Sequence, residues 1–193
     1  VPRILTILGS GETSPTMVTP HQRTFAKLGP DARGVLLDSP YGFQENADEL
    51  TEKAQQFFRE SVGREIEAVT FRSAPPADPE AHALEMARLR SADWIFAGPG
   101  SPSYALRTWA GSAVPEALHA RLREGGAVTF ASAAALTLGL VTIPVYDSIG
   151  NAVAITDATG KAIERYEYAP YGTRTIRVDL TPPYEFFLDV LGE

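Results

Sequence analysis

Residues 125–139 read GGAVTFASAAALTLG, in which an apolar run ends at Ser132 and a helical pattern of small residues follows at once. The run Ala127–Ala131 is typical of a strand buried on both faces of a parallel sheet. Ser132 therefore stands on a strand-to-helix turn, where two roles are open. It is either a nucleophile held on a sharp turn or the N-cap of the helix that follows.

Four further apolar runs precede this strand and alternate with helical patterns. They are Arg3–Leu8, Arg33–Asp38, Arg64–Phe71 and Asp93–Ala97. Alternating strands and helices predict an α/β domain of the doubly wound type, with a mostly parallel sheet covered by helices on both faces. The third run is more polar than the others, which indicates a place near an edge of the sheet.

The pattern changes after Tyr146. Two runs of period two, Ala152–Thr156 and Ala162–Tyr168, flank the turn sequence DATGK and predict a β-hairpin. Gly160 occupies the position of that turn that needs a positive φ. We therefore expect an α/β domain over residues 1–146, followed by a β-hairpin and tail over residues 147–193 that pack on it.

Length and composition limit the class of protein. The chain has 193 residues, a net charge of −7 and no cysteine. Negative charge without a basic cluster argues against nucleic acid or a membrane surface as partner. The lack of cysteine suits a cytoplasmic location, and no apolar run approaches the roughly 20 residues of a membrane span. Three scattered histidines do not make a metal site, so we expect neither a metal nor a cofactor.

Polar or glycine-rich turns follow four of the predicted strands, and ligands of an open parallel sheet bind beyond these carboxyl ends. The turns are Gly9–Ser14, Asp38–Gly42, Gly98–Ser101 and Ala131–Ala133. Backbone N–H groups in such turns can hold an anion or an oxyanion. Gly9 and Gly11 also fit the start of a dinucleotide-binding turn, but Ser14 stands where the third glycine is required. A tight turn without a nucleotide accounts for both glycines better.

A nucleophile elbow needs small neighbours, because its serine sits on a crowded turn. Ala131 and Ala133 meet this demand around Ser132. The N–H of Ala133 would then be one oxyanion donor, and an N–H of Gly9 or Gly11 another. The N-cap role fits the same residues, so both readings of Ser132 remain.

Four segments together resemble the peptidase S51 group, which includes cyanophycinases and aspartyl dipeptidases and is related to the type 1 glutamine amidotransferase-like proteins. Within residues 3–146 they are ILGSGETSPTMVTPH, DSPYGFQENADELTEKA, FAGPGSPSYALRTW and GGAVTFASAAALTLG with TIPVY. The resemblance implies a flavodoxin-like sheet, a serine nucleophile at Ser132, and a small peptide or amide substrate. It also implies oxyanion or substrate contacts in two turns, at Gly9, Gly11, Gly98 and Gly100. Glu12 and Ser101 of the same turns complete the expected site with Ala133, although Ser101 before Pro102 also fits an N-cap.

This chain departs from the group at the nucleophile and at the base. Where the group has G-x-S-A-G, the chain has F-A-S-A-A, and the group's histidine after the nucleophile is missing. A serine needs a base to accept its proton, and the histidines here are His21, His82 and His119. The last two lie in charged helical patterns typical of surface histidines, so only His21 is expected near the crevice. The carboxylates of Glu12 and Asp147 are weaker candidates.

Residues 146–175, which begin YDSIGNAVAITDATGKAIERYEYAPYG, resemble the YD repeat of RHS proteins. One repeat cannot bury its own faces, and its free strand edge makes a homodimer an expectation. Three functions stay open. The chain is a serine hydrolase impaired by the missing histidine, a non-catalytic binding or structural module, or a recombined chain that carries an RHS-type hairpin.

Overall fold

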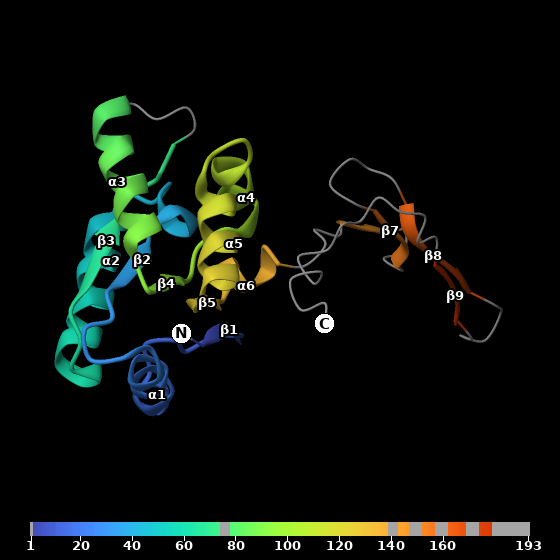
Figure 1. Cartoon of the computed structure of the whole chain (residues 1–193). Helices are drawn as coiled ribbons and strands as arrows, with labels where there is room; N and C mark the ends of the chain where they lie inside the picture. Colours follow the sequence, from blue (N-terminus) through green and yellow to red (C-terminus); the bar gives the residue numbers. More distant parts are fainter. Residues whose placement is uncertain are drawn as a thin grey trace. The chain divides into compact units, whose positions relative to one another are not determined.

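The computed structural model describes residues 2–73 and 78–138, and beyond them the backbone of four strands. The chain divides into two units, Val1–Leu138 and Gly139–Glu193 (Figure 1). The sequence placed this boundary after Tyr146 instead. The difference arises because the segment Ile143–Tyr146 pairs with a strand of the second unit.

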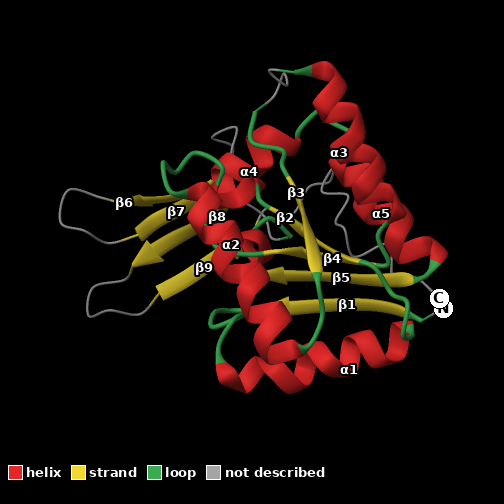
Figure 2. Ribbon diagram, turned by 90° about the vertical axis from the view of Figure 1, so that its left-hand side faces the viewer, coloured by secondary structure: helices red, strands yellow, loops and turns green. Residues whose placement is uncertain are grey.

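The first unit is built on a five-stranded parallel sheet in the order β1-β5-β4-β2-β3 (Figure 2). Its strands are β1 (Arg3–Leu8), β2 (Gly34–Leu37), β3 (Ile66–Val69), β4 (Trp94–Ala97) and β5 (Gly126–Ala131). β1, β2, β3 and β4 lie within the runs that the sequence predicted, and β5 begins one residue before its run. β3 stands at an edge, as its polar character indicated. The prediction of a doubly wound α/β domain is confirmed.

Helices cover both faces of this sheet. They are α1 (Val18–Leu28), α2 (Ala47–Phe57), α3 (Pro79–Ser91), α4 (Pro102–Trp109), α5 (Val114–Glu124) and the short α6 (Ala133–Leu136), with turns at Pro15–Met17, Ser39–Tyr41 and Phe58–Val62. Trp94 and Phe96 of β4 pack with Phe25 of α1 in the core of one face. On the opposite face Phe130 of β5 packs against Trp109 of α4.

The second unit holds an antiparallel sheet in the order β6-β7-β8-β9. Its strands are β6 (Ile143–Tyr146), β7 (Ala152–Thr156), β8 (Ala162–Tyr168) and β9 (Arg174–Val178). The predicted hairpin is β7 with β8, and it has a further strand on either side. Gly160 lies outside the described residues. The packing of the hairpin on the first unit, its likeness to the RHS repeat and the homodimer stay predictions.

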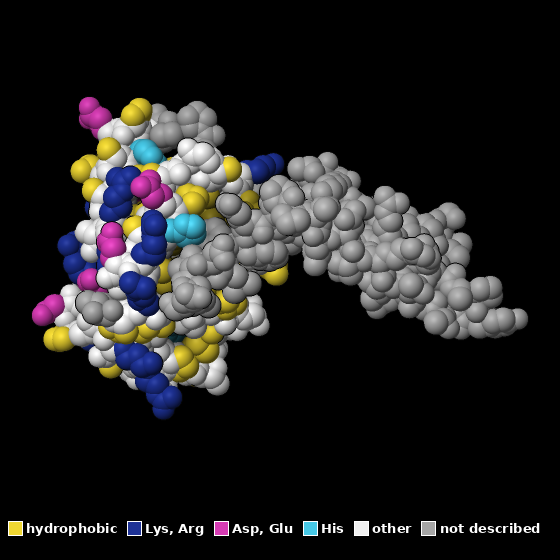
Figure 3. Space-filling model, turned by 45° about the vertical axis from the view of Figure 1, so that its right-hand side comes forward, with side chains coloured by type: hydrophobic (Ala, Val, Ile, Leu, Met, Phe, Trp, Pro, Cys, Tyr) yellow, Lys and Arg dark blue, Asp and Glu magenta, His cyan; other side chains and the backbone are white. Residues whose placement is uncertain are grey.

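Charges of both signs are mixed over the described surface. Arg88, for example, pairs with Glu85 at 2.7 Å and with Glu67 at 3.1 Å. Figure 3 shows acidic and basic side chains interspersed on one face of the molecule. Within the described ranges, none of the helices has the length and apolar character that crossing a bilayer requires.

Parallel pairing brings four strand ends to one edge of the sheet. Because β1, β5, β4 and β2 are consecutive neighbours, the turns that follow them also lie in that order. Ser132 thus stands between the turn that contains Gly9 and the turn that contains Gly98. The sheet topology brings together the turns on which the sequence placed the candidate site.

Candidate functional site at the carboxyl edge of the sheet

The backbone of Ser132 adopts a conformation that L-residues rarely take. Its φ is 51° and its ψ is −120°, and it is the one non-glycine residue with positive φ in the described part of the chain. Such a conformation costs of order 1–3 kcal/mol and persists only where its surroundings enforce it. A sharp strand-to-helix turn of this kind is also what a nucleophile elbow requires of its serine.

Two hydrogen bonds to neighbouring strands hold this turn. The N–H of Ser132 donates to Leu8 O at 3.1 Å, and the N–H of Ala134 donates to Gly98 O at 3.1 Å. The first bond ties the turn to the end of β1, and the second ties α6 to the turn after β4. The strained backbone is therefore fixed from both sides.

The hydroxyl of Ser132 does not cap α6, because its side chain makes no capping hydrogen bond. Ser101 provides the contrast, since its Oγ accepts the N–H of Tyr104 at 3.2 Å at the start of α4. For Ser101 the N-cap role is therefore the one that the structure shows. The two serines, equally ambiguous in the sequence, have different local environments.

Substitution of Ser132 by glycine tests the strain directly. We expect Ser132→Gly to raise the free energy of unfolding by about 1 kcal/mol, since relief of the strained φ outweighs the entropic cost of glycine. The matched control is Ser101→Gly, which loses a cap at negative φ and should lower stability by a few tenths of a kcal/mol, roughly. Urea denaturation followed by circular dichroism measures both. A loss of stability in Ser132→Gly would show that the turn is an ordinary cap.

One backbone donor next to the serine has no described backbone acceptor. The N–H of Ala133, the first residue of α6, donates to no backbone carbonyl within the described ranges. In the turn after β1, Gly11 has a φ of 75° and its carbonyl accepts the N–H of Ser14 at 2.8 Å. A Cβ on Gly9 would meet nothing within 4 Å. The N–H of Ala133 is thus without a described backbone acceptor, and open space lies beside Gly9.

Glu12 lies at the same edge and is almost completely buried, with 8% of its surface exposed. Its Oε1 lies close to Gly98, since a Cβ built on Gly98 would be 3.6 Å from it. No hydrogen bond or ion pair to this carboxylate is found among residues 2–73 and 78–138. The turns after β1 and β4 therefore meet at a buried carboxylate without a described partner.

Gly100 is required where two turns cross. Its φ is 132°, and a Cβ there would lie 2.0 Å from Pro40 O and 2.3 Å from Pro40 C. The N–H of Ser101 donates to the same carbonyl at 2.8 Å. The role of Gly100 is thus the close approach of the turn after β4 to the turn after β2.

His21 is buried in the core on the face of the sheet that α1 covers. It is 2% exposed and lies edge-on to Phe58 and Trp94, with ring centroids 4.9 and 5.8 Å away. Its Nε2 is 2.8 Å from Glu12 O, and because a carbonyl only accepts, Nε2 carries the proton. Burial lowers the pKa of His21 and outweighs the hydrogen bond to the Glu12 backbone and the nearby Glu12 carboxylate, which both raise it. His21 is neutral, and its Nε2 is not available as a base.

The other predicted bases do not complete a triad in the described structure. His82 lies on α3, half-buried against the ring of Phe71 at a centroid distance of 4.9 Å, rather than on the surface as its pattern indicated. His119 lies half-buried on α5. Asp147 lies outside the described residues. Within them, no hydrogen bond joins the Ser132 hydroxyl to a histidine or carboxylate.

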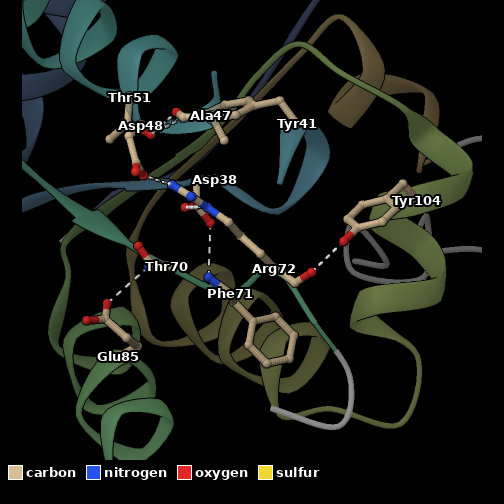
Figure 4. A network of polar contacts seen from close by, with 10 residues as sticks. All are labelled: Asp38, Tyr41, Ala47, Asp48, Thr51, Thr70, Phe71, Arg72, Glu85 and Tyr104. Atoms are coloured by element: carbon tan, nitrogen blue, oxygen red, sulfur yellow. Dashed lines mark hydrogen bonds and ion pairs between the residues drawn. The ribbon is translucent and has the colours of Figure 1, made fainter. Parts of the chain in front are cut away.

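A polar network braces the turn after β2 (Figure 4). Asp38 is fully buried and accepts the N–H of Phe71 at 3.0 Å and Nε of Arg72 at 2.6 Å. Arg72 also donates to Asp48 at 2.7 Å, and its carbonyl accepts the hydroxyl of Tyr104. Burial raises the pKa of Asp38, and its hydrogen bonds oppose this only in part. The network links the ends of β2 and β3 with α2 and α4.

Sequence analysis identified Asp38 as a strand-end residue but missed its partners. Arg72 directly follows the predicted run Arg64–Phe71, and a charged residue at that place was the available signal. Tyr41 was missed as well. Burial raises the pKa of Tyr41 to about 12, so its hydroxyl, 2.9 Å from Thr51 Oγ1, keeps its proton at neutral pH and is no base. In the described part of the chain no group of His, Asp and Glu is arranged to hold a metal ion.

Comparison with solved structures finds a similar fold in two proteins described as peptidases. The fold is similar to that of a peptidase from an acI-B1 Actinobacterium, with a TM-score of 0.61, 20% identity, and coverage of 73% of this chain and 58% of that one. It is also similar to a putative peptidase E protein from Listeria monocytogenes EGD-e, with a TM-score of 0.51, 15% identity, and coverage of 69% and 60%. Neither a protein-family model nor a curated protein matches the sequence.

The chain thus spans less than two thirds of the length of these two structures. At such low identity the likeness concerns the fold. The fold and the turn geometry define an α/β protein with a parallel sheet like that of these two structures and a strained serine at its carboxyl edge.

Proposed function

We propose that the first unit is a serine hydrolase domain of the peptidase S51 type, with Ser132 as the nucleophile and a small peptide or amide as substrate. The observation that carries this is the φ of 51° at Ser132, combined with a hydroxyl that caps no helix. A structural serine gains nothing from this strain, whereas a nucleophile is exposed by it.

In this reaction Ser132 Oγ attacks the carbonyl carbon and the carbonyl oxygen becomes an oxyanion. The N–H of Ala133 faces that oxygen as donor, together with an N–H of the Gly9–Gly11 turn. The serine proton must pass to a base, and then to the leaving amine as the acyl-enzyme forms. No histidine follows Ser132 in this sequence, and Nε2 of His21 is already protonated. We therefore propose that turnover by this chain is low.

Labelling with a fluorophosphonate tests the nucleophile, because the serine displaces fluoride and gains a mass that intact-protein mass spectrometry detects. We expect one adduct at Ser132, formed slowly and accelerated by added imidazole, a soluble base in place of the missing histidine. Ser132→Ala should remove the adduct, while Ser101→Ala, the matched change at the capping serine, should keep it.

A folded wild-type chain that gains no adduct, with or without imidazole, would overturn the nucleophile. The second candidate function, a module that binds without turnover, would then hold. The absence of a described base beside Ser132 favours that candidate.

A further inference from the structure

A pocket of about 330 Å³ opens at the carboxyl edge of the sheet, beside the Gly98 turn. Its walls come from the turns after β1, β2 and β4 and from α2, and they include Glu12, Tyr41, Lys53, Phe57, Phe96 and Pro99. The chain leaves β2 for β3 on one side and returns to β4 on the other, so the strand order reverses between β2 and β4. The pocket lies at this switch point, where open α/β sheets bind their ligands.

Glu12 is the charged group on this wall for which no hydrogen bond or ion pair is described. The residue is 8% exposed, and no ion pair or hydrogen bond to its carboxylate is found within the described ranges. The neighbouring His21 does not compensate the charge, since burial lowers its pKa and its Nε2–H is used by the Glu12 carbonyl. A buried carboxylate in this state is costly unless a cation pairs with it.

The rest of the wall suits an organic cation. Tyr41, Phe57 and Phe96 line the pocket and give it an apolar, aromatic character, and aromatic rings attract cations. Lys53 does not oppose this, because its ammonium is 2.6 Å from Glu49 and its side chain is 65% exposed. The second described pocket, about 280 Å³, lies instead along the middle of β1 and β5, at Thr6 and Thr129, away from the strand ends.

From this juxtaposition we infer that the pocket binds an organic ammonium group on an apolar body, with the Glu12 carboxylate as its counter-ion. This site does not require Ser132 to be reactive. It adds a binding specificity to the proposed hydrolase. A substrate that reaches both Ser132 and Glu12 would carry its positive charge on the side of the Gly98 turn that faces away from Ser132.

Benzylammonium is the probe, and benzyl alcohol is its neutral counterpart of similar size. By isothermal titration calorimetry at constant ionic strength, the full chain should bind benzylammonium about tenfold or more tightly than benzyl alcohol, as a charge-assisted hydrogen bond implies. Glu12→Gln should reduce this preference to within about twofold. Glu45→Gln, with the same charge change at an exposed residue, should keep the preference.

Ser132→Ala should bind benzylammonium as the wild type does, so failure of the hydrolase proposal and failure of this site are distinguishable. If Glu12→Gln does not fold, Ala54→Leu fills the pocket from α2 and should abolish the preference. Equal affinity of the wild type for both probes would overturn the inference. So would a preference that persists in a folded Glu12→Gln or Ala54→Leu variant.

Discussion

An alanine at position 100 is expected to lower the free energy of unfolding of the α/β unit by more than about 3 kcal/mol. Its Cβ would lie 2.0 Å from Pro40 O and 2.7 Å from Tyr41 N, and both are backbone atoms that no rotamer change can move aside. The two turns would have to separate, and the hydrogen bond from Ser101 N to Pro40 O would be lost. The positive φ adds its own strain.

Gly29→Ala is the control for that strain. Gly29 has a φ of 112°, and a Cβ there would meet nothing within 4 Å. This variant should therefore lose only about 1–2 kcal/mol, the cost of the φ alone. Urea denaturation of both variants isolates the clash. Equal losses in Gly100→Ala and Gly29→Ala would mean that the turns after β2 and β4 do not cross as described.

The contact between the turns at Gly100 and Pro40 also shows which features of the fold could not be predicted from the sequence. The strands were predictable because each buried strand is a continuous apolar run, and β5 coincides with its predicted run to within one residue at its start. The contact of Gly100 with Pro40 joins residues far apart in the chain, and no local pattern encodes it. From the sequence, Gly100 was a candidate for substrate contact, and the structure gives it a steric role.

In the candidate site, too, some features were predictable from the sequence and others were not. Small neighbours predicted that Ser132 tolerates a tight turn, but the choice between elbow and cap needed its φ and its hydrogen bonds. For Ser101 the local signal, a serine before Pro102, was sufficient for the N-cap. The burial of His21 and Glu12 depended on which helix covers which face of the sheet, and that follows from strand order.

Removal of the Asp38 carboxylate is expected to cost about 3–5 kcal/mol of unfolding free energy. Asp38→Ala leaves the buried N–H of Phe71 and the Nε of Arg72 without their acceptor. It also removes the side-chain link between the ends of β2 and β3, which the backbone hydrogen bond from Asp38 N to Val69 O alone would then join. Thermal and urea denaturation measure the loss.

Asp48→Ala removes the other carboxylate from the same guanidinium and is the matched control. Because the Asp48 side chain is 86% exposed, its loss should cost less than about 1 kcal/mol. Asp38→Asn should fall between the two, since the amide oxygen still accepts the N–H of Phe71 while the charge that faces Arg72 is gone. Similar losses in Asp38→Ala and Asp48→Ala would mean that burial of Asp38 does not govern the strength of this network. The turn that carries Pro40 would then have to be held chiefly by its contacts with Gly100 and Ser101.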